Sequence, residues 1–293
     1  MKFILCQPAI HRFEWELEVC LTNLKEVGFD LSDVILLFTK HDDSVPAKLS
    51  GKYGVEVHTY SDERSNKSYM PSVKPYLWWK FLAEDKSREN ETYFYFDSDV
   101  IFREKPDLRR LKCRSDKWLC SDCNGYLNLD YIKSCKNGEK IISQMCKIIR
   151  VTRKSIETIN YNSGGAQWVI KNPSAAYWKK VYNDSVKIYN YFQSIDSDIQ
   201  KWTAEMWAQL WNMMYFNIGP QISKELDFCW PTDDISEWNK NKIMHNAGVT
   251  ENMKNLFFKG KYVKSYPFGE DFSFVDKSKA SVKYVEAIKK VRC

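Results

Sequence analysis

The sequence predicts an α/β protein with a central, mostly parallel, twisted sheet flanked by helices and with a helical C-terminal extension. Strand and helix patterns alternate along the first third of the chain, which is typical of parallel sheets covered by helices. The 293 residues are 44% hydrophobic and 28% charged, as in an ordinary globular protein rather than a disordered one. No stretch approaches the ~18 apolar residues of a membrane span.

The predicted elements of the first third follow from hydrophobic periodicity. The pattern predicts strands at 2–6, 33–39, 55–60 and 92–96 and helices at 11–27, 45–53 and 75–84. The segments 33–39 and 92–96 are continuous apolar runs, so we expect them to be buried on both faces of the sheet.

The second half is more mixed. Strands are predicted at 117–121, 166–170 and 242–244, and helices at 137–150, from Pro173 to Phe192, at 202–215 and at 278–291. We find no repeat or long linker, which favours one continuous domain over 1–265 with a basic helical extension, 266–293, packed on it.

Excess positive charge gathers near the C-terminus. The net charge is +6, and from Glu251 to Cys293 ten lysine or arginine residues face five acidic residues. Such a segment could neutralise the phosphates of a nucleotide or a nucleic acid, although a solvated lysine-rich surface explains it equally well. The nine cysteines and the lack of a secretory signal indicate reduced thiols and a cytoplasmic protein.

The strongest chemical signal is the segment Phe94–Phe102, in which a buried strand runs into Asp97-Ser98-Asp99. Open α/β sheets place ligands at the carboxyl ends of their strands, and paired carboxylates there suit a hard cation such as Mg²⁺ or Mn²⁺. The alternative is a polar strand end, since Asp-Ser-Asp also favours a turn.

This strand with its Asp-x-Asp end resembles the GT-A glycosyltransferases, and three later segments fit the same family in order. Asn162–Gln167 resembles the asparagine–glycine loop beside the donor sugar, Trp202–Trp207 resembles the acidic start of the acceptor-side helix, and Ile243–Gly248 resembles the segment with a C-terminal metal-binding histidine. The whole chain, including Lys74–Trp79 and Lys259–Lys261, also resembles uncharacterised glycosyltransferases of bacterial viruses.

The resemblance implies a site in which Asp97, Asp99 and His245 hold Mn²⁺ or Mg²⁺ and a nucleotide-sugar, by default a uridine diphosphate sugar, binds beside them. The metal would neutralise the departing diphosphate. The residues that it implies for donor binding are Gln7, Pro8, Ala9, Lys74, Asp97, Ser98, Asp122, Asn162, Ser163, Gly164, Gly165, Gln167, Gly248, Lys259 and Lys261.

The acceptor side is less defined by the sequence. Glu205 is the candidate general base of an inverting enzyme; a retaining enzyme would use it to bind acceptor or donor. Trp207 and Trp211 are expected to bind the acceptor. A hydroxymethylated pyrimidine in phage DNA, modified in the host cytoplasm, is the leading acceptor, since basic charge can follow phosphates and exposed rings can stack on an extruded base.

Other functions stay open at this stage. The acceptor could be a glycan, a protein or a small molecule, and the chain could be a non-enzymatic module that binds carbohydrate or nucleic acid. A nuclease or phosphatase could also use the Asp-x-Asp pair with a metal. A structural zinc site could use Cys120 and Cys123 with Cys113 and Cys135, although the spacing is irregular. No Rossmann or P-loop glycine motif is present.

Overall fold

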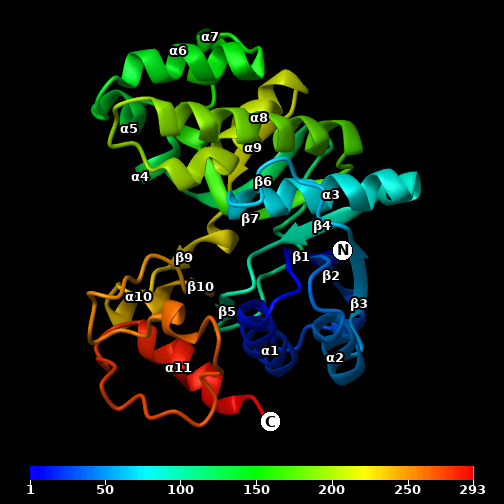
Figure 1. The fold of residues 1–293 in the computed structure, drawn as a ribbon, viewed down its shortest axis with the longest axis vertical. Coiled ribbons are helices and arrows are strands. Elements are labelled where there is room, and N and C mark those ends of the chain that lie inside the picture. The colour runs from blue at the N-terminus through cyan, green and yellow to red at the C-terminus, as the bar shows by residue number, and fades with distance from the viewer. Residues whose placement is uncertain (293) are drawn as a thin grey trace. The chain divides into compact units, whose positions relative to one another are not determined.

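The computed structural model describes residues 1–292 and shows an α/β chain (Figure 1). Its strands are β1 Lys2–Pro8, β2 Val34–Thr39, β3 Glu56–Tyr60, β4 Thr92–Tyr95, β5 Val100–Phe102, β6 Lys117–Asp122, β7 Gly164–Lys171, β8 Gly219–Ile222, β9 Phe228–Cys229 and β10 Ile243–His245. Its α-helices are α1 His11–Glu26, α2 Ser44–Tyr53, α3 Val73–Glu84, α4 Asn124–Leu127, α5 Leu129–Ser134, α6 Gly138–Ile149, α7 Arg153–Glu157, α8 Ala175–Ser194, α9 Ala204–Tyr215, α10 Ile235–Lys240 and α11 Ser281–Lys290.

Short 3-10 helices connect several of these elements. They are Leu31–Asp33, Met70–Ser72, Lys86–Asn90, Asn160–Asn162, Lys201–Thr203, Lys224–Leu226 and Lys259–Tyr262. No helix within residues 1–292 has both the length and the apolar character that crossing a membrane requires.

The chain divides into two compact units, each made of separate segments. The first unit contains residues 1–2, 60–95 and 111–224, and the second contains residues 3–59, 96–110 and 225–293. The Asp97-Ser98-Asp99 segment and His245 therefore belong to the second unit, and Glu205 belongs to the first.

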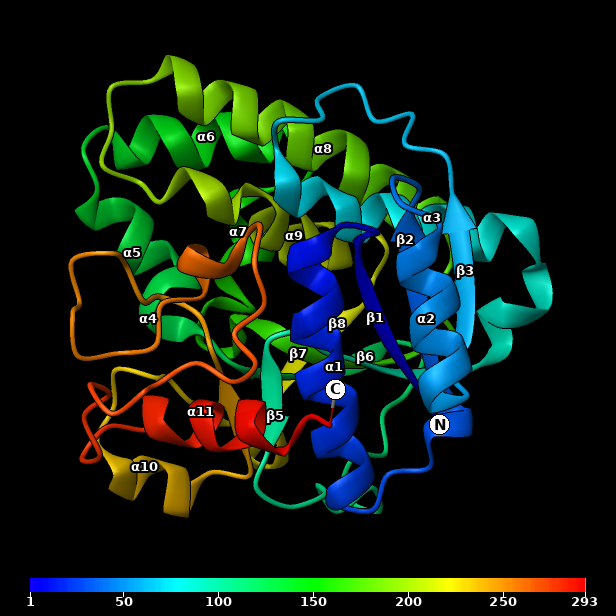
Figure 2. The same ribbon diagram turned by 60° about the horizontal axis from the view of Figure 1, so that its bottom comes forward.

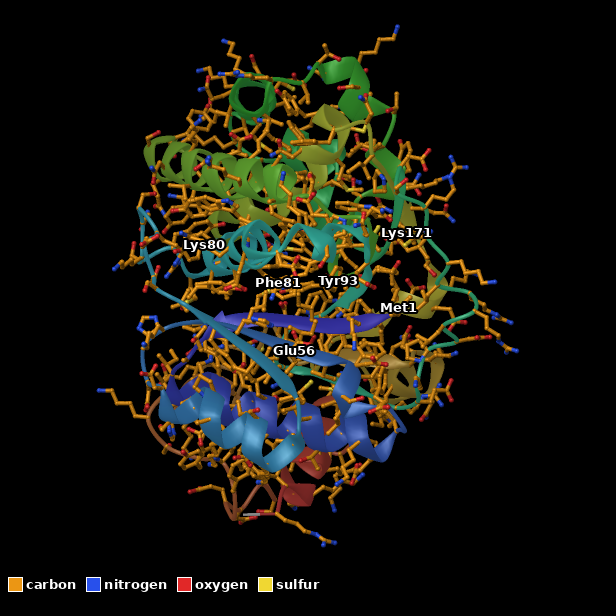
Figure 3. All side chains as sticks on the ribbon, turned by 90° about the vertical axis from the view of Figure 1, so that its right-hand side faces the viewer. Met1, Glu56, Lys80, Phe81, Tyr93 and Lys171 are labelled. Atoms are coloured by element: carbon orange, nitrogen blue, oxygen red, sulfur yellow. The ribbon has the colours of Figure 1, made fainter. Side chains whose placement is uncertain are left out.

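The first unit is built on strands β4, β7, β6 and β8, in that spatial order. β7 runs antiparallel to β4 and to β6, whereas β6 and β8 are parallel. Helices α3, α8 and α9 pack together beside these strands (Figure 1). Figure 3 shows Phe81 of α3 and Tyr93 of β4, whose rings meet edge to face with centroids 6.1 Å apart.

Tryptophan side chains fill the core of this unit. Trp78 of α3 stacks on Trp178 of α8 with ring centroids 5.0 Å apart, and Trp207 and Trp211 of α9 are 0% and 1% exposed. Each such ring buries about 150–250 Å², which is worth about 4–6 kcal/mol at ~25 cal/mol per Å². The aromatic richness of the sequence therefore serves packing here.

The second unit holds the parallel pair β1 and β2, with β3 on the far side of β2. The register joins Phe3 to Val34 and Pro8 to Thr39, so both strands end together. A small sheet of β5, β10 and β9 lies in the same unit; β10 is antiparallel to β5 and parallel to β9.

The C-terminal helix α11 contributes to the core of the second unit. Figure 2 shows α11 near α1 and β5, and Tyr284, Val285 and Ile288 are buried in one cluster with Trp15 of α1 and Ile101 of β5. Helix α11 is therefore part of the core of this unit.

Candidate functional site

The predicted acidic pair lies in a tight turn between β4 and β5. The N–H of Val100 donates to the carbonyl of Asp97 at 3.3 Å, which closes the turn. Ser98 and Asp99 are buried, whereas the Asp97 side chain is 41% exposed. One carboxylate is thus enclosed by protein while the other faces solvent.

His245 joins this pair because β10 pairs with β5. The register sets His245 opposite Val100, the residue that follows Asp99. Its Nε2 lies 3.2 Å from Asp99 Oδ1 and 3.5 Å from Asp97 Oδ2. The Trp230 ring stacks on the imidazole with centroids 5.8 Å apart, and this contact limits the tilt of the imidazole ring.

These three side chains fit a divalent cation. Their ligand atoms all lie within 4.8 Å of one another, and cations bound by oxygen or nitrogen at about 2.0–2.3 Å keep neighbouring ligands about 3 Å apart. Two carboxylates and an imidazole suit Mn²⁺ better than Ca²⁺. Within residues 1–292, this is the one group of three or more histidine, cysteine or acidic side chains that meets such a spacing.

Lys259 completes the charge balance of the group. Its Nζ contacts Asp99 Oδ2, and its side chain is 21% exposed. Burial alone would raise the pKa of Asp99, but the charges of Lys259 and His245 outweigh it and hold that pKa below its ordinary range. Burial likewise opposes protonation of His245, yet the charge of Asp99 raises the pKa of the imidazole.

Two features of this region carried no signal in the sequence. The Asn246 N–H donates to the Asp99 carbonyl at 3.0 Å, while its buried side-chain amide has no hydrogen-bond partner within residues 1–292. Ser98, expected to bind the donor, instead donates from Oγ to Glu16 of α1 at 2.8 Å. Buried polar groups usually have hydrogen-bond partners, so the amide of Asn246 is an exception in this region, whereas Ser98 follows the rule.

The predicted base Glu205 lies in the first unit and is buried. Its Oε1 is 2.9 Å from Lys74 Nζ, and the two side chains are 4% and 11% exposed. The Glu205 N–H donates to the Tyr69 hydroxyl at 2.7 Å, and Lys74 Nζ lies 4.9 Å from the centre of the Tyr95 ring. Lys74, expected at the donor, is therefore the counter-ion of Glu205.

The other donor-side residues of the first unit gather at one end of β6 and β7. Asp122 pairs with Gly164 across the two strands, and Asp122 Oδ1 accepts from the Asn124 N–H at 2.8 Å. Asn124 Oδ1 accepts from the Ser163 N–H at 3.2 Å, and Asn162 precedes it in an exposed 3-10 turn. The structure thus brings Asp122 and the asparagine–glycine loop together.

Packing leaves little room for a side chain at either glycine of this pair. A Cβ on Gly164 would lie 2.0 Å from Cys120 Sγ, and a Cβ on Gly165 would lie 2.3 Å from Met206 Cε. Two residues along β7, Gln167 is fully buried, and neither atom of its side-chain amide has a partner within residues 1–292.

The remaining expected donor residues lie in the second unit with different exposure. Gln7 is buried and donates from Nε2 to the Leu37 carbonyl at 3.2 Å; Pro8 and Ala9 are also buried, where β1 ends beside β2. Lys261 is exposed, and Gly248 has a φ of +81°, a conformation that other residues rarely adopt.

One expectation about aromatic residues needs correction, and the alternative of a cysteine zinc site gains no support. Trp207 and Trp211 are enclosed in the core and present no ring to an acceptor; the exposed rings nearest in sequence to the predicted loops are Trp202, 52% exposed, and Tyr161, 74% exposed. Cys113, Cys120, Cys123 and Cys135 form no group of three or more with metal-ligand spacing, and burial raises the pKa of the Cys123 thiol to about 12.

No family model and no curated protein sequence matches the chain. Solved structures do match. The structure of the galactosyltransferase LgtC in complex with donor and acceptor sugar analogues has a TM-score of 0.54 at 12% identity, covering 100% of this chain and 97% of LgtC. An active-site mutant of LgtC gives a TM-score of 0.55 at 11% identity over the same shares of the two chains.

The bifunctional glycosyltransferase WbbM, in its apo structure, has a TM-score of 0.53 at 8% identity over 99% of this chain. The chain spans half the length of WbbM. At these identities the likeness concerns the fold, and it confirms the predicted fold class: the chain has the GT-A fold of these glycosyltransferases.

Proposed function

We propose that the protein is a metal-dependent glycosyltransferase that moves a sugar from a nucleotide-sugar to a hydroxyl group. The observation that carries this proposal is the convergence of Asp97, Asp99 and His245 in a chain with the GT-A fold. A divalent cation held there would supply Lewis-acid stabilisation of the departing diphosphate. Lys259, which contacts Asp99, would add a positive charge beside the same phosphates.

The proposed donor is a uridine diphosphate sugar. Its nucleotide would lie against Gln7, Pro8 and Ala9, at the carboxyl end of β1, where α/β sheets place ligands. For the sugar, the family resemblance implies Asp122 and Gly164, which pair across β6 and β7 of the first unit. LgtC, described as a galactosyltransferase with donor and acceptor sugar analogues, supports a sugar-transfer role for this fold.

A hydrolysis assay across a panel of sugar nucleotides tests this function without knowledge of the acceptor. We expect release of nucleotide from one uridine donor, only with Mn²⁺ or Mg²⁺, and its loss on chelation. Asp99→Asn should abolish it, whereas Asp107→Asn, which changes an acid paired with Arg109 in the same unit, should not. Activity without metal, or exclusive use of a guanosine or cytidine donor, would contradict the proposal; a binding module would release nothing.

Glu205 is proposed to orient the acceptor or donor. Its ion pair with Lys74, at 2.9 Å, holds the buried carboxylate in place, which suits that role. The anomeric configuration of the product, read by nuclear magnetic resonance, separates a retaining from an inverting enzyme. A product with retained anomeric configuration, together with strongly reduced turnover in Glu205→Gln, supports the orienting role. Near-normal turnover of this variant would rule that role out.

The proposed acceptor is a hydroxymethylated pyrimidine in phage DNA, modified in the cytoplasm of the host. Two basic surfaces support it: the C-terminal segment, and a hollow of about 340 Å³ on the first unit lined by Arg150, Lys179, Lys180 and Lys187 with Asp184. Trp202 takes the place of Trp207 and Trp211 as the exposed ring available for stacking. Label transferred from the donor to DNA that carries hydroxymethyl pyrimidines would support this acceptor; transfer to a glycan or peptide alone would replace it.

A further inference from the structure

A buried carboxylate on α1 contacts the middle of the Asp97-Ser98-Asp99 turn. Glu16 is 1% exposed; its Oε2 accepts from Ser98 Oγ at 2.8 Å, and its Oε1 pairs with Arg12 Nε at 2.9 Å. Burying a carboxylate is costly unless it gains partners, and here both oxygens have one. One of those partners is the residue between the two predicted metal ligands.

Two other buried acids on α1 show what a purely structural acid does in this helix. Glu14 and Glu18 are 6% and 2% exposed, and both pair with Lys48 of α2; Glu18 also pairs with Lys52. These pairs join two helices. Glu16 differs because its hydrogen bond goes to the turn instead of to α2.

The turn is fixed from more than one side. The Val100 N–H holds the Asp97 carbonyl and the Asn246 N–H holds the Asp99 carbonyl, so the backbone on both sides of Ser98 is tethered. The Ser98–Glu16 hydrogen bond adds a side-chain tether at the centre. With Ser98 anchored to α1, the flanking carboxylates keep the orientation in which both approach His245 Nε2.

We propose that Glu16 is a positioning residue for the metal ligands, acting through Ser98. This inference rests on the metal site of the proposed function. Outer partners that orient metal ligands usually matter for affinity about 10–100-fold when they are removed.

Equilibrium Mn²⁺ binding, followed by the electron paramagnetic resonance signal of free Mn²⁺ without any donor, tests the proposal on the full chain. We expect Glu16→Ala and Ser98→Ala each to weaken Mn²⁺ binding by ~10-fold or more. Glu16→Gln keeps an acceptor oxygen for the Ser98 hydroxyl. Because orientation is the proposed role, the Mn²⁺ affinity of this variant should stay within about threefold of the wild-type affinity. The double variant Glu16→Ala/Ser98→Ala should bind Mn²⁺ no more weakly than Glu16→Ala alone, because both changes remove the same hydrogen bond.

Glu18→Ala is the matched control, because it removes an equally buried acid from the same helix. It should lower the unfolding temperature and leave Mn²⁺ affinity unchanged. If Glu16→Ala fails to fold, Ser98→Ala still decides the question, since it removes one hydroxyl group only.

The outcomes separate the inference from the function on which it rests. Unchanged Mn²⁺ affinity in Asp99→Asn would overturn the metal site and the inference with it. Loss of affinity in Asp99→Asn, together with normal affinity in Ser98→Ala, would overturn the positioning role alone. Loss of affinity in both, in a protein that hydrolyses no sugar nucleotide, would support the positioning role and reject the proposed reaction.

Discussion

The buried pair of Lys74 and Glu205 offers a quantitative test, because a second ion pair on the same helix serves as its control. In Lys74→Met the ammonium is lost, while the carboxylate of Glu205, 4% exposed, stays inside the first unit. Lys80, six residues along α3 and therefore on another face, pairs with Glu63 at 2.8 Å, but these side chains are 29% and 66% exposed. The two pairs have nearly equal distances and differ in burial.

The expected magnitudes follow from that difference. Removing one partner of a buried pair costs about 3–5 kcal/mol, because the other charge is left without compensation. Lys74 is 11% exposed, so we place Lys74→Met near the lower end, at about 3 kcal/mol. Lys80→Met should cost under about 1 kcal/mol, as exposed pairs do.

Urea unfolding followed by circular dichroism measures these free energies. We expect the double variant Lys74→Met/Glu205→Gln to regain about 1–2 kcal/mol relative to Lys74→Met, because a neutral amide replaces the unpaired charge. The slope of the unfolding free energy against urea should stay constant across the set, so that differences in midpoint report stability.

One result would refute this reasoning. If Lys74→Met and Lys80→Met destabilise the protein equally, burial does not control the energy of the Lys74–Glu205 pair. Glu205 would then not be held as a buried anion, and the argument that its ion pair holds it in place would fall with it.

Three further predictions concern other parts of the chain. Gly164→Ala should destabilise the protein by about 1–3 kcal/mol through its clash with Cys120, whereas Gly125→Ala, with no atom within 4 Å of its Cβ, should not; thermal unfolding tests both. The contribution of Cys123 to stability should be constant below about pH 8 and fall above about pH 9, because the unfolded thiol ionises there, whereas the pKa of the buried thiol is raised to about 12; urea midpoints at pH 7 and pH 10 test the sign. Trp202→Ala should raise KM for the acceptor and leave donor hydrolysis unchanged.

The sequence predicted most elements because their periodicity is strong. β2 is an apolar run buried at every position, and α8 begins where Ser174 caps it by accepting from the Tyr177 N–H. The direction of β7 could not be predicted, since hydrophobic alternation is the same in parallel and antiparallel strands. The start of the helix predicted at 202–215 was also misplaced, because Lys201–Thr203 forms a 3-10 turn before α9.

The site was predictable where it followed a strand end. Asp97, Asp99 and His245 each stand next to a short apolar strand, and pairing of β10 with β5 brings them together. Glu16 was not predictable, because an acid on α1 is expected to face solvent. Its buried oxygen accepts a hydrogen bond from Ser98, which is 82 residues away in sequence.

For the tryptophan rings of α9 the prediction was wrong in the opposite direction, because residues assigned to the site lie in the core. Trp207 and Trp211 stand beside the predicted acidic start of a helix, which suggested an acceptor role, yet their four-residue spacing is also that of a core stripe. Burial at 0% and 1% resolves the ambiguity in favour of the core.

The central claim is that one divalent cation bound by Asp97, Asp99 and His245 meets the diphosphate of a nucleotide. Anomalous diffraction at the manganese edge, from crystals grown with Mn²⁺ and uridine diphosphate, tests it most directly. The account predicts one strong peak at bonding distance from both carboxylates and from His245 Nε2, shared with phosphate oxygens of the nucleotide. Nucleotide bound with no manganese peak among these three side chains would contradict it.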